Sequence, residues 1–498
     1  MSTKSTKKAF ISVFNKEGIV DFAKKLQQCH GYELISTGGT YDRLKENGIQ
    51  VKEISEITGF RELIHGKVKS LHPKIHAGIL VNRSLQDEVE ELKQNNIDYI
   101  DMVVVDLYPE EIDIGGVTLL RAASKNYAYV TPVYSSKLYE KILDELDQNN
   151  GETTFELRKQ LAKETFQYTA WYDSNIADRL FEQELLPERL VVGLEKVKDL
   201  RYGENPHQAA AIYKKNSQVD YEVLQGKELS HNNMVDITSA VNIISEFVDV
   251  PAACIIKHNN PCGVAVGDNI NDAYFRAFGC DPISAFGGII GLNGTVTEEI
   301  AKQAAQVFLE VIVAPEFSEE ALEILSAKKN LRLVKLITSL TDFKNVQSYA
   351  IKDLPFGTLV QSVDNAEISR DNFNIATVCK PSQENIEDMV FAWKVAKHVS
   401  SNAIVVAKGL KTLGIGTGQT SRIASMEIAL KQACEETKGA VIASDGFFPA
   451  IDNIHAAAHA RIAGIIQPGG SIKDKDVIAE SEKYSIAMVM TGIRHFKH

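Results

Sequence analysis

Short apolar runs that alternate with helical segments restrict the fold of this chain more than any other feature. Between Ala9 and about Val133, stretches rich in β-branched and aromatic residues are separated by stretches with apolar residues at helical spacing. The expected strands and helices, in chain order, are AFISVF, IVDFAKKLQQ, YELIS, TYDRLKENG, QVKEIS, MVVVDLY and YAYVTPV. Buried strands separated by helices are typical of a parallel sheet covered on both faces. We therefore predict a doubly wound α/β domain.

A change of domain is predicted near residue 190. Residues 155–185 contain few helix breakers and are expected to be helical, and several prolines and glycines follow them. Strands and helices then alternate again, and no internal repeat is evident. The expected strands are ACIIKHN, GIIGL, LEVIVAP, AIVVAKG, AVIASDG and SIAMVMTG. Because 498 residues exceed one ordinary hydrophobic core, we expect one α/β domain at 1–190 and a larger α/β domain, or two subdomains, at 191–498.

Composition excludes several classes of function. The formal net charge of −12 argues against non-specific nucleic-acid binding, which needs a basic surface. No apolar run is long enough to span a bilayer, and the lysine-rich N-terminus lacks the apolar core of a secretory signal, so a cytoplasmic protein is expected. The six cysteines are scattered and form no C-x-x-C pair. They are expected to be reduced thiols, without a disulfide framework or a zinc cage.

Three segments of the first domain carry candidate site residues. Residues 36–40, STGGT, lie where a strand ends and a helix begins, so backbone N–H groups at the helix start can face an anion. Residues 67–73, KVKSLHP, supply two lysines, a hydroxyl and a histidine for phosphate binding and proton transfer. Residues 112–116, IDIGG, precede a predicted helix that carries Lys125. Alone, each segment is more simply explained as a turn or a solvated basic loop; together they indicate a nucleotide site.

A second group follows the apolar run Ala-Cys-Ile-Ile. Lys257 and His258 begin the polar sequence KHNNPCG, at the carboxyl edge of a strand, where α/β folds build sites. An imidazole next to an ammonium suits the attack of a weak amine on a formyl carbon. Histidine can take the amine proton, and lysine can stabilise the oxyanion or protonate the leaving nitrogen. The alternative is a strand-end turn with a hydrogen-bonded histidine; the density of polar groups favours a functional site.

Other polar or glycine-rich turns also follow apolar runs in the second domain. The arginines of these turns could clamp a phosphate or carboxylate with forked donors. The phenylalanines could stack on a flat ring. These residues are Arg201, Arg422, Arg494, Phe286, Phe447 and Phe448. Exposed arginines are usually solvated and phenylalanines usually belong to the core, so no single one decides the function.

Taken in order, these motifs resemble those of the bifunctional AICAR transformylase/IMP cyclohydrolase family, where AICAR is an aminoimidazole carboxamide ribonucleotide. The resemblance covers essentially the whole sequence. Its most specific motifs are STGGT, KVKSLHPKIHAGIL, IDIGGVTLLRAASKN, DLRYGENPHQ, KHNNPCG, SAFGG, GTGQTSRI, SDGFFP and QPGGS. The resemblance implies a methylglyoxal-synthase-like N-terminal domain, followed by a transformylase domain with two α/β subdomains of cytidine-deaminase-like topology.

In the transformylase domain, the resemblance implies that Lys257 and His258 are the catalytic pair. Positions associated with nucleotide or folate binding are Arg201, Tyr202, Asn233, Phe286, Gly287, Glu310, Asn402, Arg422, Phe447 and Arg494. The implied one-carbon donor is 10-formyltetrahydrofolate, a co-substrate, and no tightly bound cofactor or metal is expected. Family members form homodimers with this site at the interface, so a homodimer is expected, without nucleic-acid or membrane partners.

In the N-terminal domain, the resemblance implies closure of formyl-AICAR to IMP. Positions that hold the nucleotide are Ser12, Lys16, Ser36, Thr37, Gly38, Gly39, Lys67, Lys69 and Ser70. The carboxamide nitrogen attacks the formyl carbon and water is lost, and proximity supplies much of the rate because both groups sit on one ring. Lys69 and Tyr108 could move protons. Asp113 and Lys125 could polarise the amide.

The chain departs from the family pattern before Asp113. The family typically has about twenty residues between its Asn-Leu-Tyr-Pro-Phe and Ile-Asp-Ile-Gly-Gly motifs, whereas here residues 106–110, DLYPE, run directly into EID. Lys67 stands where the family has arginine. A second hypothesis is therefore a transformylase whose N-terminal domain only binds nucleotide. A third, a zinc-dependent base deaminase, requires a Pro-Cys-x-x-Cys motif that the sequence PCGVA lacks.

Overall fold

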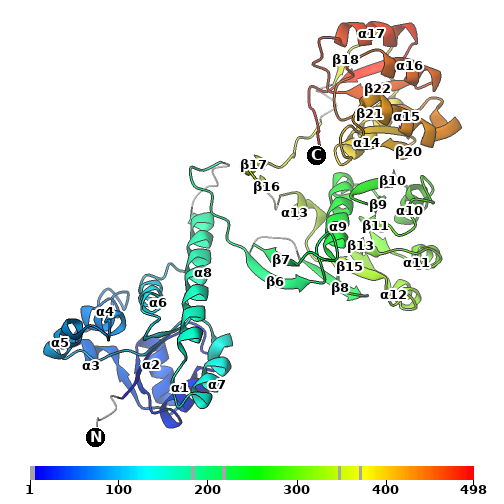
Figure 1. Ribbon diagram of the computed structural model, residues 1–498. Helices are drawn as coiled ribbons and strands as arrows, with labels where there is room; N and C mark the ends of the chain where they lie inside the picture. The colour runs from blue at the N-terminus through cyan, green and yellow to red at the C-terminus, as the bar shows by residue number, and fades with distance from the viewer. Residues whose placement is uncertain (1–5, 181–185, 216–219, 346–348, 369–372) are drawn as a thin grey trace. The chain divides into compact units, whose positions relative to one another are not determined.

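The computed structural model describes residues 6–180, 186–215, 220–345, 349–368 and 373–498. The chain divides into two compact units, Met1–Leu194 and Glu195–His498. Both units combine helices and strands (Figure 1). Within the described residues, no helix is both long enough and apolar enough to cross a bilayer.

The Met1–Leu194 unit is built on one parallel sheet. Its strands lie in the order β3-β2-β1-β4-β5, and every neighbouring pair is parallel. The strands are β1 (Lys8–Ser12), β2 (Glu33–Ser36), β3 (Val51–Glu53), β4 (Met102–Val105) and β5 (Thr131–Val133). All but β3 are buried at nearly every position, as the continuous apolar runs predicted.

Helices cover both faces of this sheet, which confirms the predicted doubly wound domain. On one face, α1 and α7 pack through residues such as Phe22, Leu26 and Ile142. On the other face, α4 and α6 pack through Ile79 and Leu120. The helices are α1 (Ile19–Gln28), α2 (Gly38–Glu46), α3 (Ile54–Thr58), α4 (Pro73–Leu80), α5 (Gln86–Gln94), α6 (Gly115–Lys125), α7 (Tyr139–Gln148) and α8 (Phe155–Leu180).

The long helix α8 corresponds to the helix expected over 155–185. It contains 26 residues and reaches Leu180 (Figure 1); residues 181–185 lie outside the described part of the chain. Arg158 of α8 donates to the carbonyls of Tyr127 and Ala128 at 2.9 and 2.7 Å. These bonds fix the segment between α6 and β5, so α8 forms part of the α/β domain.

The Glu195–His498 unit contains one mixed sheet, in the order β18-β23-β22-β21-β19-β20-β10-β9-β11-β13-β15-β8. All six strands expected from the sequence form, as β9, β11, β13, β19, β21 and β23. The strands of the first part are β8 (Tyr221–Gln225), β9 (Ala252–Lys257), β10 (Asn260–Val266), β11 (Ile289–Leu292), β13 (Val311–Ala314) and β15 (Arg332–Leu336). Those of the second part are β18 (Asn374–Ile375), β19 (Ile404–Lys408), β20 (Lys411–Gly416), β21 (Val441–Ser444), β22 (Gly464–Gln467) and β23 (Ala487–Met490).

The sheet consists of two halves with the same strand arrangement. In the first half, the hairpin β9–β10 is followed by the parallel strands β11, β13 and β15 and by the antiparallel edge strand β8. In the second half, the hairpin β19–β20 is followed by parallel β21, β22 and β23 and antiparallel β18. The halves join where Ala265 of β10 pairs with Lys411 of β20. The unit is therefore a structural repeat. No internal repeat was evident in the residues themselves, although the resemblance implied two subdomains of like topology.

Helices cover both faces of the mixed sheet. A central core between the halves contains α9 and α14, through residues such as Ala240 and Trp393. The opposite face is covered by α10, α11 and α12 in the first half and by α15, α16 and α17 in the second. The helices are α9 (His231–Ile244), α10 (Ile270–Phe278), α11 (Glu298–Ala304), α12 (Glu319–Leu325), α13 (Leu340–Asn345), α14 (Gln383–Ala396), α15 (Arg422–Ala433), α16 (Asp452–His459) and α17 (Asp474–Lys483).

A buried ion cluster joins the two halves. Glu246 follows α9, and its carboxylate meets Lys397 and His398, which follow α14, at 3.1 and 3.0 Å. Burial opposes ionisation of Glu246, but the hydrogen bond from His398 and the nearby lysines outweigh it and lower the pKa of Glu246. Removing one partner of such a cluster would leave a buried charge uncompensated, so the cluster ties the halves together.

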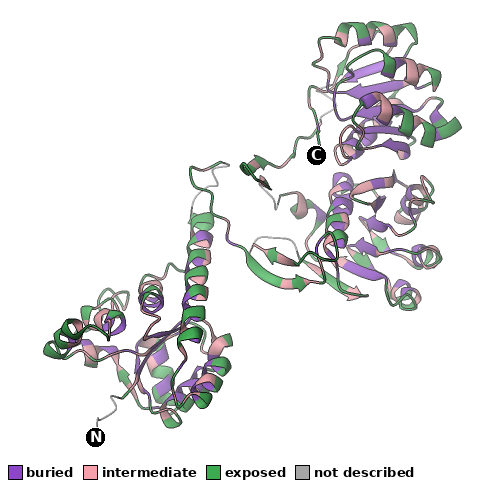
Figure 2. Ribbon diagram, viewed as in Figure 1, coloured by how far each residue is buried: buried purple, intermediate pink, exposed green. Residues whose placement is uncertain are grey.

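Two hairpins lie outside the large sheet and are mostly exposed. They are β6 (Glu195–Leu200) with β7 (Ala210–Lys214), and β16 (Tyr349–Leu354) with β17 (Gly357–Ser362). Figure 2 shows few buried residues in either hairpin. A further short pair, β12 (Thr295–Val296) with β14 (Glu316–Phe317), lies within the first half. Because isolated two-stranded hairpins are marginally stable in water, the exposed pairs are candidates for contacts with another chain.

Candidate active sites

The first candidate site lies at the carboxyl edge of the parallel sheet, where β1, β2 and β4 end. Ser12 is the last residue of β1 and Ser36 the last of β2, and Asp106 follows β4 directly. The Ser36 hydroxyl is buried and donates to the carbonyl of Ile11 at 2.7 Å, which ties β2 to β1. Carboxyl ends of parallel strands are the usual place for ligand sites in doubly wound folds.

The STGGT segment forms the start of α2 at this edge. Thr37 is the N-cap of α2, and its hydroxyl is buried without a hydrogen-bond partner among the described residues. Gly38 follows with a φ of 52°, which favours glycine. Lys16 donates to Oγ1 of Thr40 at 2.8 Å, and burial lowers the pKa of this lysine. A helix start, an unpaired hydroxyl and an ammonium together suit a phosphate group.

Lys69 and Ser70 lie between the starts of two helices. A Cβ atom built on Gly38, at the start of α2, would stand 3.0 Å from Nζ of Lys69. A Cβ atom on Gly115, the first residue of α6, would stand 2.9 Å from Oγ of Ser70. Lys69 also forms an ion pair with Glu62 at 3.0 Å. Two helix N-termini, a lysine and a hydroxyl thus border one small region, an arrangement that favours an anion.

The short connection between Tyr108 and Asp113 is held by helix α8. The Tyr172 hydroxyl accepts a hydrogen bond from the backbone N–H of Asp113 at 2.8 Å and donates to the carbonyl of Glu111 at 2.7 Å. Tyr168, one turn earlier, accepts from the backbone N–H of Leu107 at 3.3 Å. The fold therefore accommodates a connection that lacks the longer family segment.

Asp113 and Tyr108 offer the groups for proton transfer at this edge. Asp113 accepts a hydrogen bond from the N–H of Gly116 at 2.7 Å, and burial raises the pKa of its carboxyl group. The ring of Tyr108 is 44% exposed and lies edge-to-face with Phe14 at 5.4 Å. A carboxyl group with a raised pKa is closer to the range in which it can exchange protons near neutral pH.

One residue implied by the resemblance, Lys125, lies apart from this group, and another, Lys67, has no side-chain partner among the described residues. Lys125 is the last residue of α6, whereas Asp113 precedes the first turn. Eleven helical residues span about 16 Å, so α6 separates the two residues within a single chain, and their pairing on one amide stays a prediction. Lys67 lies in the loop before α4, and its side chain makes no hydrogen bond or ion pair with the residues that the structure describes.

The second candidate site is centred on the two-residue turn between β9 and β10. Lys257 is the last residue of β9, and His258 and Asn259 form the turn with φ angles of 53° and 63°. Nζ of Lys257 donates to the carbonyl of Phe286 at 2.8 Å, and the His258 side chain is exposed. The ammonium of Lys257, which can donate further hydrogen bonds, and the accessible imidazole of His258 are therefore adjacent at the end of β9.

Lys257 lies at the carboxyl end of β9, as predicted, but the amino ends of the parallel strands form this edge of the sheet. β9 runs antiparallel to β11, so the end of β9 meets the beginnings of β11, β13 and β15. Gly288 precedes β11, Glu310 precedes β13 and Arg332 begins β15. The carboxyl-edge rule applies to parallel strands, whereas Lys257 stands on the antiparallel one.

The loop at 286–288 provides surface next to Lys257. Gly287 has a φ of 74° and donates to the carbonyl of Phe308 at 2.7 Å. The ring of Phe286 is 60% exposed and lies 5.3 Å from the ring of Phe308. Glu310 forms an ion pair with Arg332 at 2.6 Å. Phe286 thus presents an open aromatic face, while the carboxylate of Glu310 already has a cationic partner.

Helix α9 holds the turn from one side. Oδ1 of Asp236 accepts a hydrogen bond from the backbone N–H of Asn259 at 2.6 Å. The hydroxyl of Ser239 donates to Oδ1 of Asn259. Burial raises the pKa of Asp236, against the effect of the hydrogen bond from the turn. Two side chains of one helix thereby fix the left-handed conformation that His258 and Asn259 share.

The second half of the unit holds the same turn from the other side. Oδ1 of Asn260 accepts from the N–H of Ser400 and from Oγ1 of Thr417, both at 2.9 Å. Nζ of Lys497, near the end of the chain, donates to the carbonyl of Asn259 at 3.3 Å. Burial lowers the pKa of Lys497 to about 8. The turn that carries His258 is therefore held by residues of both halves.

A cavity of about 390 Å³ lies in the second half of the unit. Its lining includes three residues that the sequence analysis named, Asn402, Arg422 and Phe447. Arg422 is buried and forms an ion pair with the fully buried Asp445. It also donates to Oδ1 of Asn402 at 2.8 Å. Asp445 already neutralises Arg422, which orients Asn402. The role of Arg422 as a clamp for phosphate or carboxylate stays a prediction.

The other predicted residues have local partners. Asn233 is buried and closes a capping box with Ser230 at the start of α9, at 3.1 and 3.2 Å. Arg201 and Tyr202 follow β6 and contact each other, with the guanidinium 4.7 Å from the ring. The guanidinium of Arg494 lies 4.3 Å from the ring of Phe496, which lines the cavity. Of these, the structure brings only Arg494 to the cavity.

Sequence reasoning missed three residues of the second site, Asp236, Asp445 and Lys497. Asp236 and Asp445 lie in the sequences HNNMVD and SDGFFP, two polar turns that follow apolar runs. A search for carboxylates in those motifs could have found them. Lys497 lies in no such motif, and only the fold brings it to Asn259.

The fold and the two sites define a two-part α/β enzyme for anionic substrates that carry a flat ring. The chain matches the family described as AICARFT/IMPCHase bienzyme over residues 123–432 and the MGS-like domain over residues 18–127. We conclude that the chain belongs to the AICARFT/IMPCHase bienzyme family. Its activities are AICAR formyl transfer, which uses a folate-type co-substrate, and IMP cyclohydrolysis, in purine biosynthesis.

Several relatives match over nearly the whole chain. A protein of Caldicellulosiruptor saccharolyticus named "Bifunctional purine biosynthesis protein PurH" is 48% identical, over 99% of this chain and 100% of its own length. Proteins of the same name from Thermoanaerobacter sp. and Bacillus cytotoxicus are 47% and 46% identical over the same shares. A solved structure titled "Crystal structure of ForH" matches 35% of this chain and 98% of its own, at 30% identity and a TM-score of 0.33. The hypothesis of a transformylase with a merely nucleotide-binding N-terminal domain is therefore not supported, and neither is the deaminase hypothesis.

Proposed function

We propose that Lys257 and His258 carry the formyl transfer, with 10-formyltetrahydrofolate as the donor. The observation that carries this proposal is the β9–β10 turn, which presents an exposed imidazole next to an ammonium. The amine of AICAR attacks the formyl carbon, and His258 accepts the proton that the amine loses. Lys257 stabilises the developing oxyanion and protonates the leaving nitrogen of the folate.

Asp236, Ser239 and Lys497 act in this proposal as positioning residues. They contact the backbone or side chain of Asn259 and not the substrate. Holding His258 in the left-handed region costs conformational energy, and a network that fixes the turn offsets this cost. A well-placed base also raises the rate through orientation. Phe286 and Phe447 offer aromatic surface for flat rings, and Asn402 and Arg494 offer polar groups.

For ring closure, we propose that the substrate phosphate binds between the starts of α2 and α6. Lys16, Thr37, Gly38 and Ser70 supply donors there, and Ser12, Ser36, Gly39 and Lys67 are assigned to the same substrate. Formyl-AICAR closes when its carboxamide nitrogen attacks the formyl carbon and water leaves, giving IMP. Lys69, Tyr108 and Asp113 transfer the protons. Lys125, at the far end of α6, remains a predicted residue of ring closure.

We further propose that the protein is a cytoplasmic homodimer. The exposed hairpin β16–β17 supports the dimer, because Ile351, Phe356 and Leu359 are 46%, 102% and 58% exposed there. Apolar side chains on an isolated hairpin favour contact with another protein surface. Sedimentation at several protein concentrations tests this part. A monomer at micromolar concentration would overturn it.

A two-step assay tests the proposed roles. The purified protein receives either AICAR with 10-formyltetrahydrofolate, or formyl-AICAR alone, and IMP is followed in both cases. We expect His258→Ala to lower formyl transfer by about two orders of magnitude or more and to leave cyclisation of formyl-AICAR unchanged. Lys69→Ala should abolish cyclisation and leave formyl transfer intact. Loss of both activities in either variant would indicate a folding defect, and near-normal transfer by His258→Ala would refute the assignment.

A further inference from the structure

The connection that carries Tyr108 and Asp113 is bound along its length by one helix, α8. Three side chains of this helix, Tyr168, Tyr172 and Arg179, form hydrogen bonds with the backbone of the connection. They follow one another at intervals of four and seven residues, so they lie on one face of the helix. A single face of α8 therefore determines the course of the connection.

Tyr108 lies between two of these hydrogen bonds. On one side, the hydroxyl of Tyr168 accepts from the backbone N–H of Leu107 at 3.3 Å. On the other side, Nη1 of Arg179 donates to the carbonyl of Pro109 at 2.7 Å. Leu107 and Pro109 are the two chain neighbours of Tyr108. Because both neighbours are bound to α8, the backbone from which the Tyr108 ring projects is fixed on either side.

Asp113 is held by two helices. The hydroxyl of Tyr172 accepts from the backbone N–H of Asp113 at 2.8 Å and donates to the carbonyl of Glu111 at 2.7 Å. The carboxylate of Asp113 accepts from the N–H of Gly116 in α6 at 2.7 Å. A Cβ atom built on Gly116 would overlap this carboxylate, so glycine is needed there. Helix α8 thus fixes the backbone of Asp113, and the start of α6 fixes its side chain.

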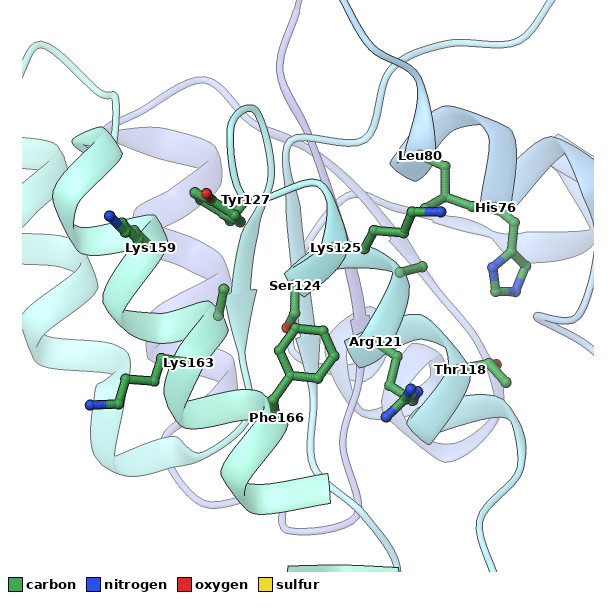
Figure 3. A pocket seen from close by; sticks show the side chains of 12 residues that line it. His76, Leu80, Thr118, Arg121, Ser124, Lys125, Tyr127, Lys159, Lys163 and Phe166 are labelled. Carbon is green, nitrogen blue, oxygen red and sulfur yellow. The ribbon is translucent and has the colours of Figure 1, made fainter. Parts of the chain in front are cut away.

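Helix α8 can act as a support because it is itself packed against α6. Tyr172 is 4% exposed and belongs to the same core as Leu119 and Ala122 of α6. Earlier in α8, the ring of Phe166 lies 5.5 Å from the guanidinium of Arg121 on α6. Figure 3, a view into the pocket beside these helices, shows this contact. Hydrogen bonds from α8 therefore hold the connection in a fixed position relative to α6.

We propose that Tyr168, Tyr172 and Arg179 are positioning residues for ring closure. The inference rests on the proposed roles of Tyr108 and Asp113, whose backbone surroundings these three residues bind. A displacement of about 1 Å at a reacting group can lower a rate by about a hundredfold. The connection lacks the longer segment that the family pattern has at this place, so α8 determines where its two proton-transfer groups stand.

Removal of one hydroxyl tests the proposal. Tyr172→Phe deletes both hydrogen bonds to the connection and keeps the ring in the core. With formyl-AICAR as the only substrate, kcat of ring closure should fall about tenfold or more, because Asp113 is no longer held in place. KM should stay the same, since the groups proposed for the substrate phosphate are unchanged. Formyl transfer, which is proposed to take place in the other unit, should proceed at the parent rate.

The matched control is Tyr134→Phe. This tyrosine of the same unit donates to Glu164 of α8 at 3.1 Å and makes no hydrogen bond with the connection among the described residues. The control should cyclise formyl-AICAR with the parent kcat. Normal kcat in Tyr172→Phe, or an equal loss in the control, would overturn the proposal. A tenfold rise of KM in Tyr172→Phe would also overturn it, because the whole nucleotide site would then be disturbed.

Arg179 allows a test by rescue. Arg179→Met removes the donor to Pro109, whereas Arg179→Lys keeps a cationic donor of similar reach. Because Arg179 is exposed, the methionine variant should lose only about threefold in kcat of ring closure. The lysine variant should recover most of this loss. Equal kcat values for the two variants would overturn the role of Arg179.

The variant Asp113→Asn distinguishes this inference from the proposed function. If Asp113→Asn closes the ring at the parent rate, the proposed role of Asp113 fails. If Asp113→Asn is slow while Tyr172→Phe is normal, only the positioning role fails. In the double variant Asp113→Asn/Tyr172→Phe, the remaining rate should equal that of Asp113→Asn alone, because the hydroxyl acts through Asp113. A further loss in the double variant would show that Tyr172 acts by another route and would overturn its assigned role.

Discussion

The two halves of the Glu195–His498 unit contain the same hairpin with different side chains. In the first half, Lys257 is followed by His258 and Asn259, with φ angles of 53° and 63°. In the second half, Lys408 is followed by Gly409 and Leu410, with φ angles of 59° and 57°. Two central residues with positive φ are typical of the tightest hairpins. The backbone is thus repeated, whereas the imidazole occurs once.

The support beneath the two turns is repeated as well. Asp236 is the sixth residue of α9 and Asp388 the sixth of α14. Asp236 accepts a hydrogen bond from the N–H of Asn259 at 2.6 Å. Asp388 accepts from the N–H groups of Gly409 and Leu410 at 2.9 and 2.7 Å. A helix carboxylate that binds the turn amides is therefore a property of the fold, and the residues that we propose for catalysis occur in only one of the two copies.

The difference lies in the first central residue of each turn. Glycine adopts a positive φ without strain, as at Gly409, whereas histidine adopts it at a conformational cost, though more often than most other residues. A side chain kept in a strained conformation, where glycine serves the same turn elsewhere, is typical of a functional site. The comparison predicts that the hairpin can lose His258 without losing its shape.

The largest expected effect is on formyl transfer when the first turn receives the sequence of the second. In the double variant His258→Gly/Asn259→Leu, the turn keeps a sequence that the same fold already uses. Transfer should fall by about two orders of magnitude or more, because the general base is gone, while the melting temperature stays close to that of the parent protein. Steady-state kinetics and calorimetry measure the two quantities. Transfer above about a tenth of the normal rate would end the proposed role of His258.

The next effect separates the two carboxylates beneath the turns. Asp236→Ala and Asp388→Ala should each lower the free energy of unfolding by about 1–3 kcal/mol, because each leaves turn amides unpaired. Only Asp236→Ala should also lower kcat of formyl transfer, by about tenfold or more, since it loosens His258. Denaturant unfolding and kinetics on both variants give the test. Equal effects on kcat would mean that Asp236 acts through stability alone.

Much of the fold followed from the sequence because buried strands are continuous apolar runs. Strands whose sequences are not continuous apolar runs were not predicted. β10, NPCGVAV, contains proline and glycine, and β15, RLVKL, alternates apolar residues with cations. The structural repeat followed only from the resemblance and not from the residues, because His258-Asn259 and Gly409-Leu410 share a backbone conformation and no side-chain chemistry.

The candidate sites were predictable where chemistry is local in sequence. Lys257 and His258 stood out because polar residues follow a buried strand directly. The ion pair of Arg422 could not be predicted, because its partner Asp445 is close only in the folded chain. Phe448, considered for ring stacking, is fully buried in the core. Long-range pairing decides whether a charged or aromatic residue is available, and a single sequence does not contain that information.

The smallest expected effect concerns how the turn carbonyls are held. The carbonyl of Leu410 accepts from the backbone N–H of Val266 at 3.0 Å, which does not titrate. The carbonyl of Asn259 accepts from Lys497 instead, at 3.3 Å, and burial lowers the pKa of Lys497 to about 8. Only the first turn should therefore respond to alkaline pH.

The variant Lys497→Met tests this difference. Because the pKa of Lys497 is lower in the folded than in the unfolded protein, burying the ammonium costs stability below pH 8, and the cost fades as pH rises towards 10.5. The free energy of unfolding of the parent protein should thus rise relative to that of Lys497→Met between pH 8 and 10.5. Over the same interval, formyl transfer by the parent protein should decline, as the neutral amine holds Asn259 more weakly, while transfer by the variant stays flat. Parallel pH profiles for the two proteins would show that Lys497 neither titrates in this range nor positions the turn.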